Sequence, residues 1–179
     1  MECTRLAGAG HRVATAVLVA ALLFPLAAQE HQALPCDETL RTVMRFSGTD
    51  FRSVQGPKVE NKRREFYYEA ALYLPEANYC RILKDKEWMY LCEWRKKSRI
   101  EAPQLFETLA GQVQVALGNN WQMTSKAGPA KIFYAEGKPV VQLNLHEDRS
   151  EVHLLVLRPG SPKEGFTGKI PTTEELTFR

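Results

Sequence analysis

Residues 140–157 read VVQLNLHEDRSEVHLLVL, and this stretch decides the fold because apolar and polar residues alternate on both sides of a polar turn. Alternation with a period of two is typical of a strand with one buried face. With Asp148 and Arg149 at the turn, six apolar residues share one face in three facing pairs: Leu145 with Val152, Leu143 with Leu154, and Val141 with Val156. The stretch therefore predicts an antiparallel hairpin with one face in a core.

A second hairpin is predicted upstream, where Tyr79–Leu83 and Trp88–Trp94 flank a short polar segment. With Lys86 at the tip, the facing pairs are Lys84 with Trp88, Ile82 with Tyr90, and Cys80 with Cys92. The two cysteines then lie on one face of adjacent strands, within reach of a disulfide bond. We expect a structural Cys80–Cys92 bridge, and the alternative is that Cys36 pairs with either of them.

Helical patterns precede both groups of strands. Asp37 is a candidate N-cap for a helix that ends at Ser47–Asp50, and Ala102-Pro103 opens a second helix that Gly118 closes. Further strands are expected at Phe51–Gln55, Phe66–Leu74, Trp121–Thr124 and Lys131–Ala135. The pattern predicts an α+β fold in which two helices pack on an antiparallel sheet.

The two halves of the chain follow the same order, a helix followed by three or four strands. This order favours a duplicated helix-plus-strands unit. In layout it resembles the small secreted proteins that inhibit β-lactamases, which are tandem helix-plus-sheet repeats with disulfide-tied strands. The resemblance rests on layout alone, so it implies an architecture and no functional residue.

Residues 1–28 are predicted to be a secretory signal peptide. About a dozen apolar residues follow a short positively charged start, whereas a membrane-spanning helix needs about 20. Pro25 then breaks the helix, and Leu26-Ala27-Ala28 offers small residues for cleavage. An uncleaved anchor is the alternative. We expect the remainder to comprise a short lead (29–35), a single α+β domain (36–158) and a flexible C-terminal tail (159–179).

The charge balance gives little support to a nucleic-acid or anionic membrane partner. The chain carries 24 Lys+Arg and 21 Asp+Glu, a net charge of only +3. After loss of residues 1–28, three cysteines remain, so at most one internal bridge forms. The sequence predicts a secreted or periplasmic protein with no membrane span after cleavage.

The outward face of the last hairpin carries the candidate metal ligands. The predicted register puts Asn144 opposite His153 and His146 opposite Glu151, so the two imidazoles stand diagonally beside a carboxylate. These groups are zinc ligands, but a further firm ligand is missing from the pattern. A solvated polar strand face is the more common arrangement. His146, His153 and Glu151 are therefore weak candidates, and no cofactor is expected.

Aromatic and basic residues gather in and after the disulfide hairpin. Three aromatic residues share one strand face and three basic residues follow: Trp88, Tyr90 and Trp94, then Arg95, Lys96 and Lys97. If no helix covers this face, it is an exposed stripe suited to a partner protein. If a helix covers it, the aromatic residues belong to the core. We expect a partner-binding face here.

The sequence contains no Gly-rich phosphate loop, paired-carboxylate motif or His-Glu-x-x-His. We therefore expect that the protein is not an enzyme. We expect an exported, non-catalytic binding or inhibitory module of the cell envelope or extracellular space, with an unidentified partner. One alternative is a metal-dependent hydrolase, which requires the candidate ligands to converge in a cleft. Another is an envelope assembly accessory protein whose open sheet edge pairs with a partner strand.

Overall fold

The computed structural model describes residues 36–60, 66–126, 129–162 and Gly165. Every described residue lies within the unit His31–Arg179. The predicted signal peptide (1–28) and lead (29–35) lie outside the described residues. The same holds for residues 163–164 and 166–179 of the predicted tail.

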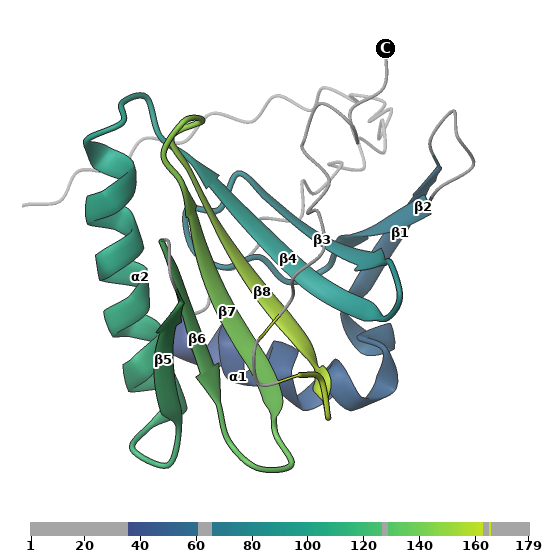
Figure 1. The fold of residues 1–179 in the computed structure, drawn as a ribbon. Coiled ribbons are helices and arrows are strands. Elements are labelled where there is room, and N and C mark those ends of the chain that lie inside the picture. Colours follow the sequence, from purple (N-terminus) through teal and green to yellow (C-terminus); the bar gives the residue numbers. More distant parts are fainter. Residues whose placement is uncertain (1–35, 61–65, 127–128, 163–164, 166–179) are drawn as a thin grey trace, which may run out of the picture. The chain divides into compact units, whose positions relative to one another are not determined.

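The described residues form two α-helices and an eight-stranded antiparallel sheet, a mixed α+β fold (Figure 1). The first half contains, in chain order, α1 (Cys36–Phe46), two short 3-10 turns (Ser47–Thr49 and Arg52–Val54), β1 (Gln55–Glu60), β2 (Phe66–Ala70), β3 (Tyr79–Lys84) and β4 (Trp88–Arg95). The second half contains α2 (Glu101–Leu117), β5 (Gln122–Lys126), β6 (Ala130–Tyr134), β7 (Pro139–His146) and β8 (Glu151–Pro159).

The strands are ordered β1-β2-β3-β4-β8-β7-β6-β5 across the sheet. Within each half, consecutive strands are neighbours, so each half is a meander of four antiparallel strands. The two meanders meet at the centre, where β4 pairs with β8 over seven residues of each strand. Figure 1 shows these two strands side by side in the middle of the sheet. This central β4–β8 pairing joins the two halves of the chain.

One face of the sheet, which we call the inner face, packs against both helices. Alternation along the strands directs large apolar side chains to this face, as the sequence pattern requires. The resulting core combines helix and strand residues, among them Leu40, Val43, Phe106, Val113, Tyr90, Trp94, Leu143 and Leu154. Burial of this apolar surface, worth roughly 25 cal/mol per Å², is the main term that holds the helices on the sheet.

Both predicted hairpin registers are confirmed. In β3–β4 the facing pairs include Lys84 with Trp88, Ile82 with Tyr90 and Cys80 with Cys92. In β7–β8 they include Leu145 with Val152, Leu143 with Leu154 and Val141 with Val156. The predicted disulfide bond is present between Cys80 and Cys92, whose Cα atoms are 4.1 Å apart.

The segment Phe51–Gln55, predicted to be a strand, is instead a tight turn that leads into β1. Asp50 and Phe51 adopt left-handed backbone conformations, with φ of 56° and 59°. This geometry places the Phe51 ring in the core, 6.3 Å from the ring of Tyr90. Because the burial of a large aromatic side chain offsets backbone strain of this kind, the chain turns here rather than extending.

Two strand boundaries also differ from the prediction. β2 ends at Ala70 rather than at Leu74, although the Leu74 side chain is still buried in the inner-face core. β1 begins at Gln55, where the predicted strand Phe51–Gln55 ends, and it runs through Gly56 and Pro57 to Glu60. Pro57 is tolerated because β1 lies at the edge of the sheet, where its missing N–H leaves no ladder partner unpaired.

The opposite, outer face of the sheet also carries an apolar cluster. Its members are Tyr67, Leu83, Met89, Leu91, Ile132, Val140, Leu155 and Leu157. After β8 the chain reaches this face at Gly165, where an added Cβ would collide with the Gln142 side chain on β7. The sheet is therefore apolar on parts of both faces. The polar residues that lie on the outer face beside the apolar cluster are candidates for a site.

Candidate functional site

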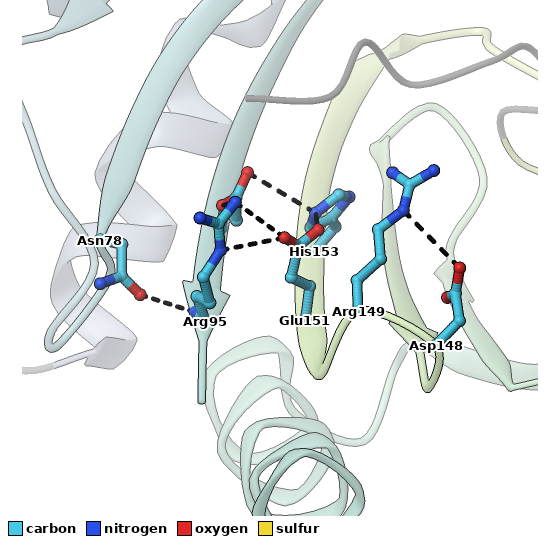
Figure 2. A network of polar contacts seen from close by, with 7 residues as sticks. Asn78, Arg95, Asp148, Arg149, Glu151 and His153 are labelled. Carbon is cyan, nitrogen blue, oxygen red and sulfur yellow. Dashed lines mark hydrogen bonds and ion pairs between the residues drawn. The ribbon is translucent and has the colours of Figure 1, made fainter. Parts of the chain in front are cut away.

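Five polar residues meet on the outer face, on two adjacent rungs that cross the centre of the sheet. On one rung, Glu93 of β4 faces His153 of β8. On the next, Arg95 of β4 faces Glu151 of β8, and Glu151 also faces His146 of β7. Figure 2 shows Arg95, Glu151 and His153 directed toward one another. We call these five residues the central polar cluster.

Three members of the central polar cluster are almost completely buried. The exposed fractions are 4% for Glu93, 5% for Glu151 and 1% for His153. The expectation that this strand face is solvated is therefore wrong at these positions. Ionised groups are costly to bury unless they are paired or bound to a metal ion, so the contacts of each charge decide what the cluster can do.

Arg95 is the cation that pairs with both carboxylates. Its Nη2 lies 2.8 Å from Oε1 of Glu151 and 3.5 Å from Oε1 of Glu93, and its Nε donates to the same Glu151 oxygen at 3.0 Å. The backbone N–H of Arg95 donates to Oδ1 of Asn78 at 2.6 Å (Figure 2). Arg95 thus holds the Oε1 side of both carboxylates.

His153 lies on the Oε2 side of the same carboxylates. Its Nε2 is 3.5 Å from Oε2 of Glu151 and 3.7 Å from Oε2 of Glu93, too far for a hydrogen bond. Within the described ranges, neither His153 nitrogen nor Nε2 of His146 has a hydrogen-bond partner. The two imidazole rings are adjacent, with centroids 4.5 Å apart.

Both histidines are held in the neutral form. Burial, together with the neighbouring His146, lowers the pKa of His153 to about 4, although Glu93 opposes the shift. Burial also lowers the pKa of His146, and the positive charge of Arg149 acts in the same direction. Neutral imidazoles beside two carboxylates offer lone pairs rather than protons, which is the protonation state in which histidine binds metal ions.

Two of the three weak metal candidates, Glu151 and His153, lie together in the structure, and His146 is outside their group of ligand atoms. Glu151 and His153 each offer a ligand atom within 4.8 Å of the other, and the third member of that group is Glu93. Sequence reasoning missed Glu93 because it lies on a strand whose pairing with β8 is not visible in the sequence. The only available signal was its place between Cys92 and Trp94, where alternation assigns it to the outer face.

The predicted exposed aromatic stripe is not formed, because Tyr90 and Trp94 are buried in the inner-face core. The hydroxyl of Tyr90 donates to the carbonyl of Leu72 at 2.9 Å, and the indole N–H of Trp94 donates to the carbonyl of Pro75 at 3.0 Å. Trp88 is half-buried and packs against the same core. These residues therefore contribute to the fold rather than to an open surface.

The basic residues that follow are divided between different environments. Arg95 belongs to the central polar cluster. Nζ of Lys96 lies 3.9 Å from Oε2 of Glu76, and Lys97 is exposed. The three residues therefore do not form one continuous basic patch with Trp88, Tyr90 and Trp94.

A different surface feature lies at the far edge of the sheet. β5 is the last strand in the sheet order, and the side chains of Gln122, Met123, Thr124 and Ser125 are all exposed. Met123, at 50% exposure, is one of the few large apolar side chains in the described ranges that remain open to solvent. The sheet therefore has no further strand that could pair with the backbone groups on the outer edge of β5.

A cavity of about 270 Å³ lies beside this edge. It is lined by Pro103, Phe106, Glu107, Ser125, Pro129, Ala130, Lys131 and Leu145. Lys131 and Glu107 pair across its wall. The cavity is slightly smaller than the roughly 300–1,000 Å³ of typical small-molecule sites, so its size suits a single large side chain.

These observations define a mixed α+β protein with one central antiparallel sheet, a disulfide-tied hairpin and a cluster of buried His and Glu side chains that contact Arg95. No helix in the described residues is long and apolar enough to cross a membrane. Comparison with protein-family models, curated proteins and solved structures found no match.

Proposed function

We propose that this protein is an exported, non-catalytic binding module that captures an extended segment of a partner protein along the edge of β5. The observation that carries the proposal is the open β5 edge, with four consecutive exposed side chains. An extended segment that adds to such an edge gains main-chain hydrogen bonds along its whole length.

The contrast between the two edges of the sheet supports this choice. β1, at the other edge, contains Gly56 and Pro57, and its register with β2 is irregular between Gln55 and Lys58. Proline and bulges are common devices that protect an edge from further pairing. β5 contains neither glycine nor proline and pairs with β6 in an unbroken register over five residues.

The cavity beside β5 supplies a second element of recognition. Ser125 belongs both to the edge strand and to the cavity wall, so an added strand would pass the opening. Phe106 and Leu145 line the cavity, which favours an apolar side chain of the partner as the anchor. Main-chain pairing along β5 does not depend on the sequence of the partner segment. The partner segment is therefore extended and carries at least one apolar side chain.

Two observations support export to the cell envelope or the extracellular space. The Cys80–Cys92 disulfide bond is of the kind that persists in oxidising compartments. The apolar N-terminal stretch has the length of a signal peptide rather than of a membrane span. We place the protein in a secreted or periplasmic location.

The shared element order supports the proposal that the chain is a duplicated unit. Each half runs through one helix and four strands, and the two halves enter the sheet from opposite edges to meet at β4 and β8. In this arrangement β1 and β5 are equivalent strands, of which only β5 has kept an unprotected edge.

Photo-crosslinking at the two edges tests the proposed function. A photoreactive residue is placed at Ser125 on β5 or, as the matched control, at Lys58 on β1, and each chain is mixed with secreted or envelope extract. We expect one crosslinked partner from position 125 and none from position 58. Thr124→Pro should abolish the crosslink, because proline removes a main-chain donor and stiffens the edge.

The site of contact is then checked by hydrogen exchange on the captured complex. We expect slower exchange of the backbone amides of β5 in the complex than in the free protein, with no change along β1. Equal crosslinking from both edges, or capture that persists in Thr124→Pro, would contradict the proposal.

A further inference from the structure

We infer that Glu93, Glu151 and His153 form a binding site for a divalent transition-metal ion of the zinc class. The three ligand atoms are Oε2 of Glu93, Oε2 of Glu151 and Nε2 of His153. The site lies on β4 and β8, so it is independent of the partner edge on β5.

The spacing of the ligand atoms fits a tetrahedral ion. Bonds of 2.0–2.2 Å to zinc place neighbouring ligand atoms about 3.4 Å apart in a tetrahedron. Nε2 of His153 is 3.5 Å from one Oε2 atom and 3.7 Å from the other, and all three atoms lie within 4.8 Å of one another. A contraction of a few tenths of an ångström around His153 brings these two pairs into the coordination range.

Arg95 contacts the two carboxylates on the side away from His153. It contacts Oε1 of Glu151 and Oε1 of Glu93, whereas the Oε2 atoms of both residues face His153. Metal-binding carboxylates are commonly oriented by hydrogen bonds to the carboxylate oxygen that does not bind the metal. Arg95 is therefore a positioning residue, and its own place is fixed by the hydrogen bond from its backbone N–H to Asn78.

The unpaired histidine nitrogens are the independent observation that points to a ligand. His153 is 99% buried and makes no hydrogen bond to any described residue, although Nε2 points between two carboxylates. A buried polar nitrogen without a hydrogen bond costs free energy, which a metal bond would offset. Nε2 of His146, adjacent to it, is buried and unsatisfied in the same sense.

The charges favour a divalent cation over a neutral ligand. Glu93 and Glu151 carry two formal negative charges in buried positions, whereas the single formal positive charge of Arg95 is nearly half exposed. Imidazole with carboxylate suits zinc and similar transition metals, whereas magnesium and calcium prefer oxygen ligands alone. The ligand class is therefore a borderline transition-metal ion.

The position of the site indicates a structural role for the ion. Glu93 comes from the first half of the chain, and the remaining ligands come from the second half. The ion therefore links the two four-stranded meanders at the β4–β8 pairing. All three ligand residues are almost fully buried, so the protein shields the ion from bulk solvent.

Metal analysis of the purified full chain tests the inference. We expect about one Zn²⁺ per chain to remain after dialysis, and excess Mg²⁺ or Ca²⁺ not to displace it. Zn²⁺ at about 100 times its dissociation constant should raise Tm by ~5–10 °C over the chelator-treated protein. Glu151→Gln and His153→Gln should each weaken Zn²⁺ binding by about 100-fold. Removal of a residue that only supports a ligand costs about 10–100-fold in metal affinity, so loss of a ligand should reach the upper end of that range.

Two control substitutions match these changes chemically. Glu147→Gln alters an exposed carboxylate on the β7–β8 turn, and His31→Gln alters a histidine outside the described residues. Both should bind Zn²⁺ as the unchanged chain does. If a cluster variant fails to fold, the Co²⁺-loaded unchanged chain decides: an intense visible band indicates four-coordinate ligation with nitrogen. Absence of bound Zn²⁺, a weak octahedral Co²⁺ spectrum, or equal loss in a control variant would overturn the inference.

Discussion

Arg95 is the side chain on which the electrostatics of the central polar cluster depend. Its replacement by alanine would leave Glu93 and Glu151 buried without their cation. Loss of one partner from a buried ion pair costs about 3–5 kcal/mol, and because nearly half of the Arg95 side chain is exposed to solvent we expect about 2–3 kcal/mol. Urea denaturation in the presence of chelator measures the change.

Lys97→Ala provides the comparison for this substitution. Lys97 is an exposed cation two residues away, so its loss should change the free energy of unfolding by less than about 0.5 kcal/mol. A similar small effect for Arg95→Ala would mean that solvent, rather than Arg95, stabilises the two carboxylates.

His153 makes stability depend on pH in a defined direction. Its pKa is about 4 in the folded protein, against about 6.5 in an unfolded chain. The unfolded state therefore gains a proton first as the pH falls, so the stabilising contribution is fully present above about pH 6.5 and is lost towards pH 4. The loss amounts to about 3 kcal/mol.

Chemical denaturation at a series of pH values, in chelator, measures this effect. The carboxylates titrate in both the unchanged chain and His153→Gln, so the informative quantity is the difference between the two slopes from pH 7 to pH 5. We expect the unchanged chain to lose stability more steeply. Parallel slopes would show that folding leaves the pKa of His153 unchanged, and a shallower slope for the unchanged chain would show that folding raises it.

Among the secondary-structure elements, the β3–β4 hairpin is the one fixed covalently. The Cys80–Cys92 bridge closes a loop with a sequence separation of 12. On the chain-entropy model a loop of this size contributes about 3 kcal/mol, and we expect the Cys80→Ala/Cys92→Ala variant to lose that amount in urea denaturation. Reduction of the unchanged chain should give a similar loss. A non-reducing peptide map that links Cys36 to either residue would contradict the assignment.

The hairpin registers could be predicted from the sequence because both depend only on local information. Alternation about a short polar turn determines which residues face one another, and Cys80 and Cys92 follow from the same rule. The turn at Asp50 and Phe51 could not be predicted in this way. Its left-handed backbone is stabilised by the position of the Phe51 ring beside Tyr90, which is a tertiary contact.

The central polar cluster could be predicted only in part for a related reason. Glu151, His153 and His146 belong to one hairpin, so their proximity was visible in the sequence. Glu93 joins them only through the pairing of β4 with β8, which connects distant parts of the chain. The same pairing places Trp94 against Val152 in the inner-face core, which is why the aromatic stripe is not exposed.

The arrangement of two meanders joined at β4–β8 has a consequence for how the fold can be divided. The pairing brings apolar residues of one half against those of the other on the inner face, for example Tyr90 against Val156 and Cys92 against Leu154. α1 and α2 also pack within the same core. Each half alone would expose this surface to water, so neither half has a complete core.

We therefore expect a chain cut between Lys97 and Ser98 to fold only when both pieces are present. The cut falls after β4 and before α2, so it removes no strand or helix. Each piece alone should be unfolded by circular dichroism, and the two pieces co-expressed should purify as a 1:1 complex with the spectrum of the intact chain. A cut after Leu143, inside β7, is the control and should prevent assembly because it divides a central strand. A piece that folds alone would show that the β4–β8 pairing joins two independent domains, whereas reassembly of both pieces would establish a single core shared by two halves.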